Sequence, residues 1–196
     1  MSDPTHQTPR YALGQRVIHW AVAVMVICVL SGGLLLGILG FKGVTEVFGA
    51  SIRNFIYTYH KTFGLIILAA MIIRLGMRIR QGAPPYEPPL EPWQRVMSGI
   101  VHKLLYVGLL AMPILGWLAT DASEYPVEFF AWSLPQFIAK DQALGALLYD
   151  LHGIVGWAVT GLLALHIGAA MMHWLIKRDR VMSRISLWPS KPSSSD

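Results

Sequence analysis

Four long apolar stretches separated by polar segments give the chain its pattern. They cover roughly residues 17–39, 55–76, 100–119 and 144–176. A helix needs about 20 predominantly apolar residues to cross a bilayer, so every stretch is long enough. The segment 78–92 contains two proline pairs and therefore cannot be helical throughout. The pattern predicts an all-α membrane protein, a four-transmembrane-helix bundle.

The same pattern divides the chain into one domain with two tails. Residues 1–16 are expected to form an N-terminal tail, residues 17–176 the transmembrane domain, and residues 177–196 a basic tail that ends in serines. The N-terminal residues lack the basic, apolar and cleavage-site pattern of a removable signal peptide. The first apolar stretch is therefore expected to remain as a helix.

Composition excludes an ordinary soluble domain. Only 14% of the residues are charged and 54% are hydrophobic, with a mean hydropathy of +0.49, whereas soluble domains carry about 25% charged residues. The net charge of +5 does not indicate nucleic-acid binding, because the basic residues flank the apolar stretches. The single cysteine, Cys28, excludes an internal disulfide, a cysteine-rich iron–sulfur site and covalent haem attachment through a C-x-x-C-H motif.

Lysine and arginine are distributed unevenly between the two sides of the predicted bundle. Twelve lie in the tails and the connector between the second and third stretches with its flanks: Arg10, Arg16, Arg74, Arg78, Arg80, Arg95, Lys103, Lys177, Arg178, Arg180, Arg184 and Lys191. Four lie on the other side: Lys42, Arg53, Lys61 and Lys140. Cytoplasmic segments carry the positive excess. Both termini are therefore expected to be cytoplasmic.

Histidines provide the candidate chemistry, since six of the seven lie in or beside the apolar stretches. His152 and His166 share the last stretch and are 14 residues apart. On an α-helix this spacing returns a side chain to within about 40° of the same face, about 21 Å further along the axis. One helix thus presents a histidine near each side of a hydrocarbon core about 30 Å thick.

Chain direction gives each of these histidines a partner at a similar depth. The first stretch begins at the cytoplasmic face, so His19 lies near His166, and we name these two the inner pair. The second stretch runs the opposite way, so His60 lies near His152, and these form the outer pair. Two imidazoles on opposite sides of one iron are typical ligands of b-type haem. The pattern predicts two haem b groups whose iron is bound by these four histidines.

Other interpretations of the histidines remain open. A lone histidine in a membrane is more often a hydrogen-bonding group between helices. His173 lies seven residues after His166 on the same face and is a rival ligand for the inner haem. A zinc site would need about four close ligands, often including carboxylates, and none gather at either depth.

Several motifs occur together along the chain: His19-Trp20, His60 at the start of the second stretch, His102-x-x-x-Tyr106 followed by Pro113, and His152-x13-His166-x6-His173. From about Tyr11 to Arg184 the chain resembles the bacterial cytochrome b561 family. It is also similar to the cytochrome b subunits of membrane hydrogenases and formate dehydrogenases. The resemblance implies a four-helix bundle in the bacterial inner (plasma) membrane, with two non-covalent b haems on the inner and outer pairs and electron exchange with a quinone.

Other polar residues are candidates for secondary roles. Haem propionates need cations, and the candidates are Arg16, Arg74 and Arg78 for the inner haem and Arg53 and Lys61 for the outer haem. These residues equally suit the membrane edge. His173 and Trp174, with His102 as a weaker candidate, are candidates for a quinone pocket, since histidine can exchange protons near neutral pH. They equally suit a capping or interface histidine with an anchoring tryptophan. Gly33 and Gly37 form a GxxxG match that suits either a dimer face or room for a porphyrin.

Three functional hypotheses follow. The resemblance includes superoxide oxidases, which implies an oxidoreductase that passes electrons from external superoxide through two haems to ubiquinone. Against it, the outer segments carry four basic and six acidic residues, and a negative field repels an anion. The second hypothesis is an electron-transfer subunit that docks a periplasmic redox protein on the acidic, aromatic segment 121–137, which also suits a membrane interface. The third is a haem-binding sensor or structural subunit without turnover.

Overall fold

The computed structural model describes residues 9–123 and 125–188. Its elements are α1 (Leu13–Gln81), α2 (Pro92–Ala122), the strands β1 (Glu128–Phe129) and β2 (Trp132–Ser133), α3 (Gln142–Met171), the π-helix η1 (Met172–Lys177) and the 3₁₀-helix η2 (Met182–Arg184). Glu124 and Lys191, which enter the charge arguments above, lie outside the described residues, as do the outer parts of both predicted tails.

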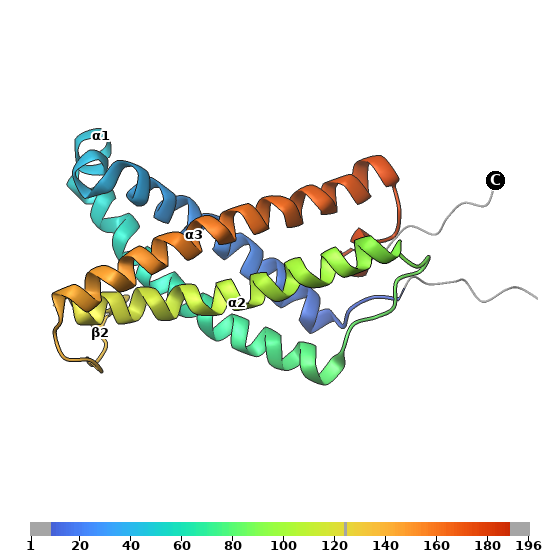
Figure 1. The fold of residues 1–196 in the computed structure, drawn as a ribbon, viewed down its shortest axis with the longest axis horizontal. Helices are drawn as coiled ribbons and strands as arrows, with labels where there is room; N and C mark the ends of the chain where they lie inside the picture. The colour runs from blue at the N-terminus through green and yellow to red at the C-terminus, as the bar shows by residue number, and fades with distance from the viewer. Residues whose placement is uncertain (1–8, 124, 189–196) are drawn as a thin grey trace, which may run out of the picture.

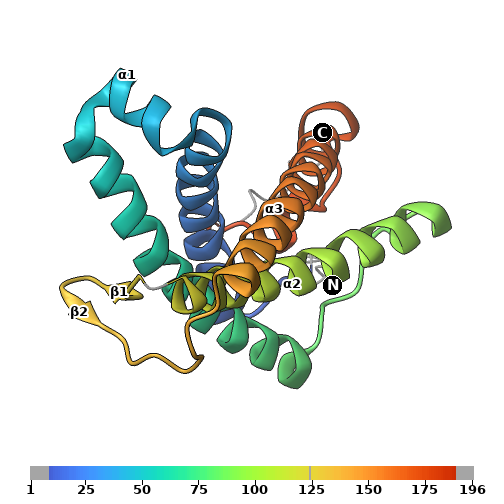
Figure 2. The same ribbon diagram turned by 60° about the vertical axis from the view of Figure 1, so that its left-hand side comes forward.

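Two glycines break α1 into arms that fold back on each other. Gly40 and Gly49 have non-helical backbones with φ of 67° and 84°, a region that glycine adopts without steric cost. They separate a first arm (13–39) from a second arm (50–81) through a short bridge, and the chain reverses there in Figures 1 and 2. The side-chain amide of Gln15 donates to the carbonyl of Met77 at 3.2 Å and joins the far ends of the arms.

In the described part of the chain, three helices are long and apolar enough to cross a membrane: α1, α2 and the continuous unit of α3 and η1 (Gln142–Lys177). This confirms the prediction of a helical membrane protein. The predicted stretches 17–39 and 55–76 both fall in α1, one in each arm. Four separate crossings and the side on which the termini lie stay predictions.

Local sequence explains where the other helices begin. Pro92 is at the first position of α2, where its missing N–H is not needed. The carboxylate of Asp141 accepts hydrogen bonds from the amides of Ala143 and Leu144, both at 3.0 Å, and caps α3. Pro113 lies inside α2, which continues past it.

One apolar cluster joins the two arms of α1 with α2 and α3. Its buried members are Val22, Val26, Ile67, Met71, Leu109 and Val159. Helix α3 packs mainly along α2, and the two helices lie side by side in Figures 1 and 2. A Cβ atom on Gly108 would come within 2.6 Å of the Val159 side chain, so glycine at this position permits the close contact. The cluster holds these four helical segments together at the middle of the bundle.

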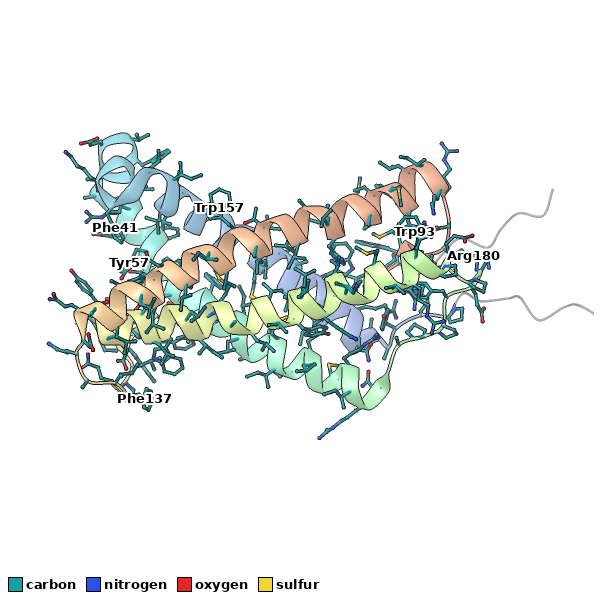
Figure 3. All side chains as sticks on the ribbon, in the orientation of Figure 1. Phe41, Tyr57, Trp93, Phe137, Trp157 and Arg180 are labelled. Carbon is teal, nitrogen blue, oxygen red and sulfur yellow. The ribbon has the colours of Figure 1, made fainter. Side chains whose placement is uncertain are left out.

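The two ends of the bundle differ in character. At one end, which we name the strand end, β1 and β2 form a small antiparallel hairpin that is bonded to Thr62 of the second arm, at the same end of the bundle in Figure 1 as the reversal of α1. At the other, the terminal end, residues 179–188 form a C-terminal strap that packs against the start of α1. Three side chains of that start, Arg10, Arg16 and Trp20, donate hydrogen bonds to backbone carbonyls of the strap. Figure 3 shows Tyr57 and Phe137 toward the strand end, and Trp93 and Arg180 toward the terminal end.

Candidate functional site

The outer pair joins the second arm of α1 to α3. The ring centroids of His60 and His152 are 6.0 Å apart, and the ring planes are inclined by 71°. Both residues are half-buried. Two imidazoles that bind opposite sides of one metal through nitrogens about 2 Å from it have centroids roughly 6 Å apart. The spacing therefore fits two ligands of one iron, and rotation about the metal–nitrogen bonds leaves the interplanar angle free.

Each outer histidine is held by the same local arrangement on the neighbouring helix. Nδ1 of His60 donates to the carbonyl of Val29 at 3.1 Å, and Nδ1 of His152 donates to the carbonyl of Met112 at 2.9 Å. Four residues beyond each carbonyl is a glycine, Gly33 or Gly116. A Cβ atom there would come within 2.7 Å of the His60 ring or 3.1 Å of the His152 ring.

These contacts prepare both outer rings to bind a metal. A proton on Nδ1 leaves Nε2 with a free lone pair, and a carbonyl acceptor on the other nitrogen is the usual support of a metal-bound histidine. The sequence allowed Gly33 to serve a dimer face or to leave room for a porphyrin, and in the structure the His60 ring lies against this glycine.

The inner pair joins the first arm of α1 to α3. The ring centroids of His19 and His166 are 6.2 Å apart, with planes inclined by 80°. Nδ1 of His19 is buried and has no hydrogen-bond partner among the described residues. His102 of α2 adds a third ring 5.0 Å from His166, and its Nδ1 bonds the carbonyl of Ser98 at 2.6 Å. The inner pair has the same spacing as the outer pair, and His102 stands beside it.

The two pairs lie at different depths of the bundle. Helix α3 is unbroken between His152 and His166, so their 14-residue separation corresponds to about 21 Å along its axis. Val159, which is 2% exposed, lies midway between them in the central apolar cluster. An apolar layer thus separates two sites of similar geometry. No group of three or more histidine, cysteine or acidic side chains in the described residues is arranged to hold a bare metal ion.

His173 forms a pair with Asp179. It is 7% exposed, and its Nδ1 bonds the carboxylate of Asp179. The neighbouring Trp174 is 56% exposed, so the two predicted quinone candidates have different surroundings.

The candidate cations also differ in their surroundings. Arg74 is close enough to His19, His102 and His166 to act on all three electrostatically, and its guanidinium lies 5.4 Å from the Tyr106 ring centroid. Arg16 donates to the carbonyl of Ser186 at 2.9 Å, while its buried Nε has no partner among the described residues. Of the candidate cations, Arg74 therefore has the surroundings that best suit a partner of an inner-haem propionate.

The remaining candidates have strong contacts elsewhere. Arg78 donates to the hydroxyl of Tyr11 at 3.0 Å. Arg53 donates to Asn54 and to Thr45. Lys61 forms an ion pair with Glu128 at 2.9 Å.

The two described acidic residues of segment 121–137, Asp121 and Glu128, are bonded within the molecule. Asp121 is 1% exposed, and its carboxylate accepts from the amides of Phe137 and Ile138 at 2.8 and 2.9 Å. Glu128 is bound to Lys61, and Asp141 caps α3. The large side chains left exposed there are aromatic: Tyr125, Phe130, Trp132 and Phe137.

A hollow at the strand end lies one helical turn from the outer pair. It has a volume of about 470 Å³ and is lined by Ser123, Tyr125, Gln142, Ala146 and Tyr149. Tyr149 precedes His152 by three residues and bonds the hydroxyls of Tyr57 and Thr120. Hydrogen-bonded hydroxyl groups therefore lie about one helical turn from the outer pair, on the side of the hollow.

Sequence reasoning missed two residues of these sites. Asp179 is six residues from His173, a spacing that does not place two side chains on one face of an α-helix. Gly116 lies in a different apolar stretch from His152, so only the register of α2 against α3 brings them together. For Asp179, the available sequence signal was an isolated acidic residue in a basic tail.

Comparison with known proteins agrees with this geometry. The family model of prokaryotic cytochrome b561 matches residues 10–186. Two proteins of Escherichia coli (strain K12) are similar: cytochrome b561 homolog 1, 30% identical over 128 residues (64% of this chain, 72% of the relative), and cytochrome b561 homolog 2, 26% identical over 182 residues (92% and 93%). A Yersinia pestis protein named probable superoxide oxidase CybB is 23% identical over 176 residues (90% and 95%). The family implies a haem b cofactor. Because the match covers nearly the whole chain and all six histidines of the bundle, the chain belongs to the prokaryotic cytochrome b561 family of membrane electron-transfer proteins.

Proposed function

We propose that the chain is a di-haem b cytochrome of the bacterial inner membrane that moves electrons from external superoxide to ubiquinone. It crosses the bilayer four times, with both termini in the cytoplasm. The observation that carries the proposal is the repetition of one geometry: two histidine pairs with centroids 6.0 and 6.2 Å apart, at two depths of the same helices. When bound, each haem supplies an iron that accepts and releases one electron.

The side chains divide the work between positioning and charge. The outer and inner pairs hold the two irons, and the Val29 and Met112 carbonyls orient the outer rings. Arg74 is the cation proposed to offset the negative propionates at the inner site. His173, with Nδ1 bound to Asp179, presents Nε2 to the quinone. The apolar cluster around Val159 excludes water between the two sites.

Superoxide as donor is supported by the strand end and by one relative. The hollow beside Tyr149 brings a small molecule within one helical turn of the outer pair. The relative named probable superoxide oxidase CybB aligns along 90% of this chain. The ion pair between Lys61 and Glu128 removes one cation from any field that attracts an anion, so Arg53 becomes the leading residue for that role.

The alternative function is electron transfer with a periplasmic protein partner. The described acidic side chains of segment 121–137, Asp121 and Glu128, are bonded within the molecule, which weakens charge-based docking on this segment. Its exposed aromatic residues suit the membrane interface, where such rings are enriched. The small-donor function is therefore favoured.

The test is a stopped-flow experiment on the purified, oxidised cytochrome. Superoxide is mixed with the protein, and haem absorption is followed with and without ubiquinone. Fast haem reduction that drains into ubiquinone supports the proposal. No reduction by superoxide, in a sample whose haems are reduced by ubiquinol, points to a protein donor. Haems that neither reagent reduces indicate a sensor or structural role, and a haem content of one or none per chain refutes the di-haem assignment.

A further inference from the structure

Asp179 reaches His173 because the last turn of the final helix is not α-helical. The chain passes from α3 into the π-helix η1, a rare form that is frequent at functional sites. Arg178 then adopts a left-handed conformation with φ of 51°, which turns the chain back on itself. As a result the amide of Asp179 donates to the carbonyl of His173 at 3.2 Å, while the carboxylate of Asp179 bonds the His173 ring.

The carboxylate of Asp179 has two different sides. Oδ2 bonds Nδ1 of His173, whose side chain is buried. Oδ1 accepts from the amide of Val181 at 3.0 Å, and the residue lines a cavity of about 150 Å³ at the terminal end. Asp179 therefore connects a buried imidazole with a space at the surface of the bundle.

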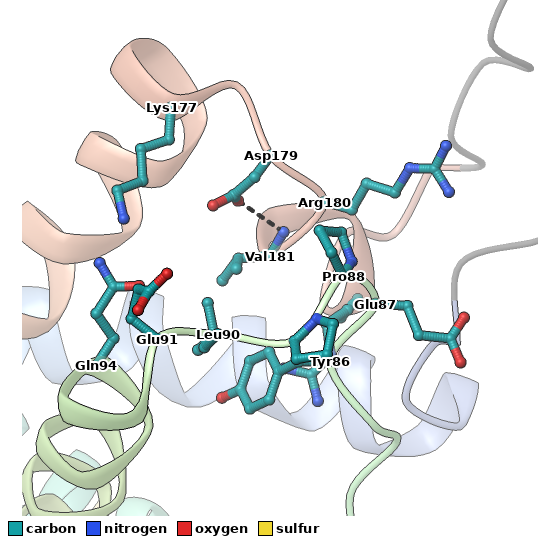
Figure 4. Close-up of a pocket in the computed structure, with 12 residues that line it drawn as sticks. Tyr86, Glu87, Pro88, Leu90, Glu91, Gln94, Lys177, Asp179, Arg180 and Val181 are labelled. Atoms are coloured by element: carbon teal, nitrogen blue, oxygen red, sulfur yellow. Dashed lines mark hydrogen bonds between the residues drawn. The ribbon is translucent and has the colours of Figure 1, made fainter.

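The cavity is polar and ringed by charge, as Figure 4 shows. The charged and polar groups around Asp179 come from the connector, the start of α2, the end of η1 and the C-terminal strap: Glu87, Glu91, Gln94, Lys177, Arg180 and Arg184. Burial raises the pKa of Tyr86 in its wall, but hydrogen bonds with Ser98 and Arg184, together with the Arg184 charge, lower it overall. Such a space holds water and small ions, which are the source of protons on this side.

We propose that Asp179 is a positioning and proton-supplying residue that recharges His173 from this cavity during quinone reduction. The inference rests on the proposed function. Reduction of one ubiquinone to ubiquinol takes two electrons, which arrive singly from the external donor, and two protons. Each proton leaves Nε2 of His173 for a quinone carbonyl oxygen, and one proton enters the Asp179–His173 pair from the cavity in its place. The charge of the pair is thereby restored after each transfer.

The arrangement suits proton transfer better than mere helix capping. A carboxylate that holds Nδ1 of a histidine fixes the tautomer and stabilises the protonated ring. A cap needs only the contact with the Val181 amide, whereas the second oxygen is directed at a buried ring. Positioned acid–base groups contribute about 100- to 10,000-fold to rate. Loss of Asp179 is therefore expected to slow the quinone step without affecting the haems.

The variant Asp179→Asn tests the proposal in the full-length holoprotein. Haem content and reduction by dithionite are expected to match wild type, while transfer of electrons from reduced haem to ubiquinone slows about 100-fold. Added formate, a weak acid small enough for the cavity, is expected to restore much of the rate. A purely structural role predicts no rescue. The matched control is Asp141→Asn, which alters a carboxylate that caps backbone amides at the opposite end.

The outcomes separate the two proposals. Wild-type protein that does not reduce ubiquinone overturns the proposed function and this inference with it. Wild-type protein that reduces ubiquinone, together with an Asp179→Asn variant of equal rate, overturns the inference alone, as does a slow variant that formate leaves unchanged. If Asp179→Asn fails to assemble, Asp179→Ser replaces it, because serine retains an acceptor for the Val181 amide. Formate is expected to restore its rate in the same way. The double variant with His173→Gln is expected to be no slower than His173→Gln alone, and additive losses would contradict the shared route.

Discussion

Gly33 is the residue whose replacement should separate the outer haem from the inner one. An ideal Cβ atom built at this position lies 2.7 Å from Cε1 and 3.3 Å from Nδ1 of His60. Ordinary van der Waals contact begins at 3.4 Å, so the ring would have to retreat by 0.7 Å. Metal–ligand distances tolerate only about 0.2 Å. Gly33→Ala therefore places a methyl group in conflict with metal binding by His60.

The cost follows from the packing. Inserting one methyl group into a filled site costs about 1–3 kcal/mol. This cost corresponds to a roughly 5- to 150-fold lower affinity for the outer haem. The same substitution favours the helix by about 1 kcal/mol, so loss of secondary structure is not expected. Gly37→Ala is the matched control, because nothing lies within 4 Å of a Cβ atom there.

The assay is the haem-to-protein ratio combined with the rate of haem transfer to excess apomyoglobin. Wild type and Gly37→Ala should each hold two haems and lose both slowly. Gly33→Ala should lose one haem faster by the stated factor and retain the inner one. A Gly33→Ala protein with two haems and wild-type transfer rates would show that the close approach of Gly33 to His60 has no bearing on haem binding.

Three further predictions concern the other contacts. His166→Ala should remove the inner haem alone while His173→Ala keeps both, as low-temperature difference spectra can distinguish; the opposite result would make His173 the ligand. Glu128→Gln removes the carboxylate from the Lys61 ammonium, which is 9% exposed and keeps only its contacts with the Pro126 carbonyl and the Tyr57 ring among the described residues. The free energy of unfolding should fall by about 1–3 kcal/mol, a loss limited by the 37% exposure of Glu128; an unchanged thermal transition would count against the ion pair. Asp121→Ala should cost about 2–4 kcal/mol and open segment 123–141 to proteolysis, whereas Asp121→Asn, which retains an acceptor oxygen, should cost less than about 1 kcal/mol; equal protease sensitivity of the two would refute this reasoning.

The helices and the histidine pairs were accessible to sequence reasoning because both depend on short-range regularities. Apolar length is enough to predict a membrane helix. The 14-residue spacing of His152 and His166 fixes their depths once α3 is a continuous helix, and it is. Opposite chain direction then assigns His19 and His60 to their partners, and the structure brings the rings of each pair to about 6 Å. Whether those rings bind haem remains a prediction.

The contacts that escaped sequence reasoning depend on departures from regular geometry or on tertiary packing. Asp179 meets His173 only because η1 is a π-helix and Arg178 is left-handed. A charge count treats each acidic residue as exposed, yet Asp121 is buried, and its Oδ2 accepts from backbone amides of a segment 16 residues further on. The register of α2 against α3, which sets Gly116 beside His152, is not encoded in either stretch alone.

The C-terminal strap makes the closure of the terminal end depend on residues that follow all the long helices in the chain. Arg10 donates to the carbonyl of Ser186, 176 positions later in the chain. During translation the N-terminal end emerges first, so its hydrogen-bond partners do not exist until every helix has been made. The terminal end beside His19 therefore stays open while the helices are made and closes only after the strap has been synthesised. A chain that stops before residue 183 would contain all seven histidines and both ligand pairs. It would lack the strap carbonyls that accept hydrogen bonds from Arg10, Arg16 and Trp20.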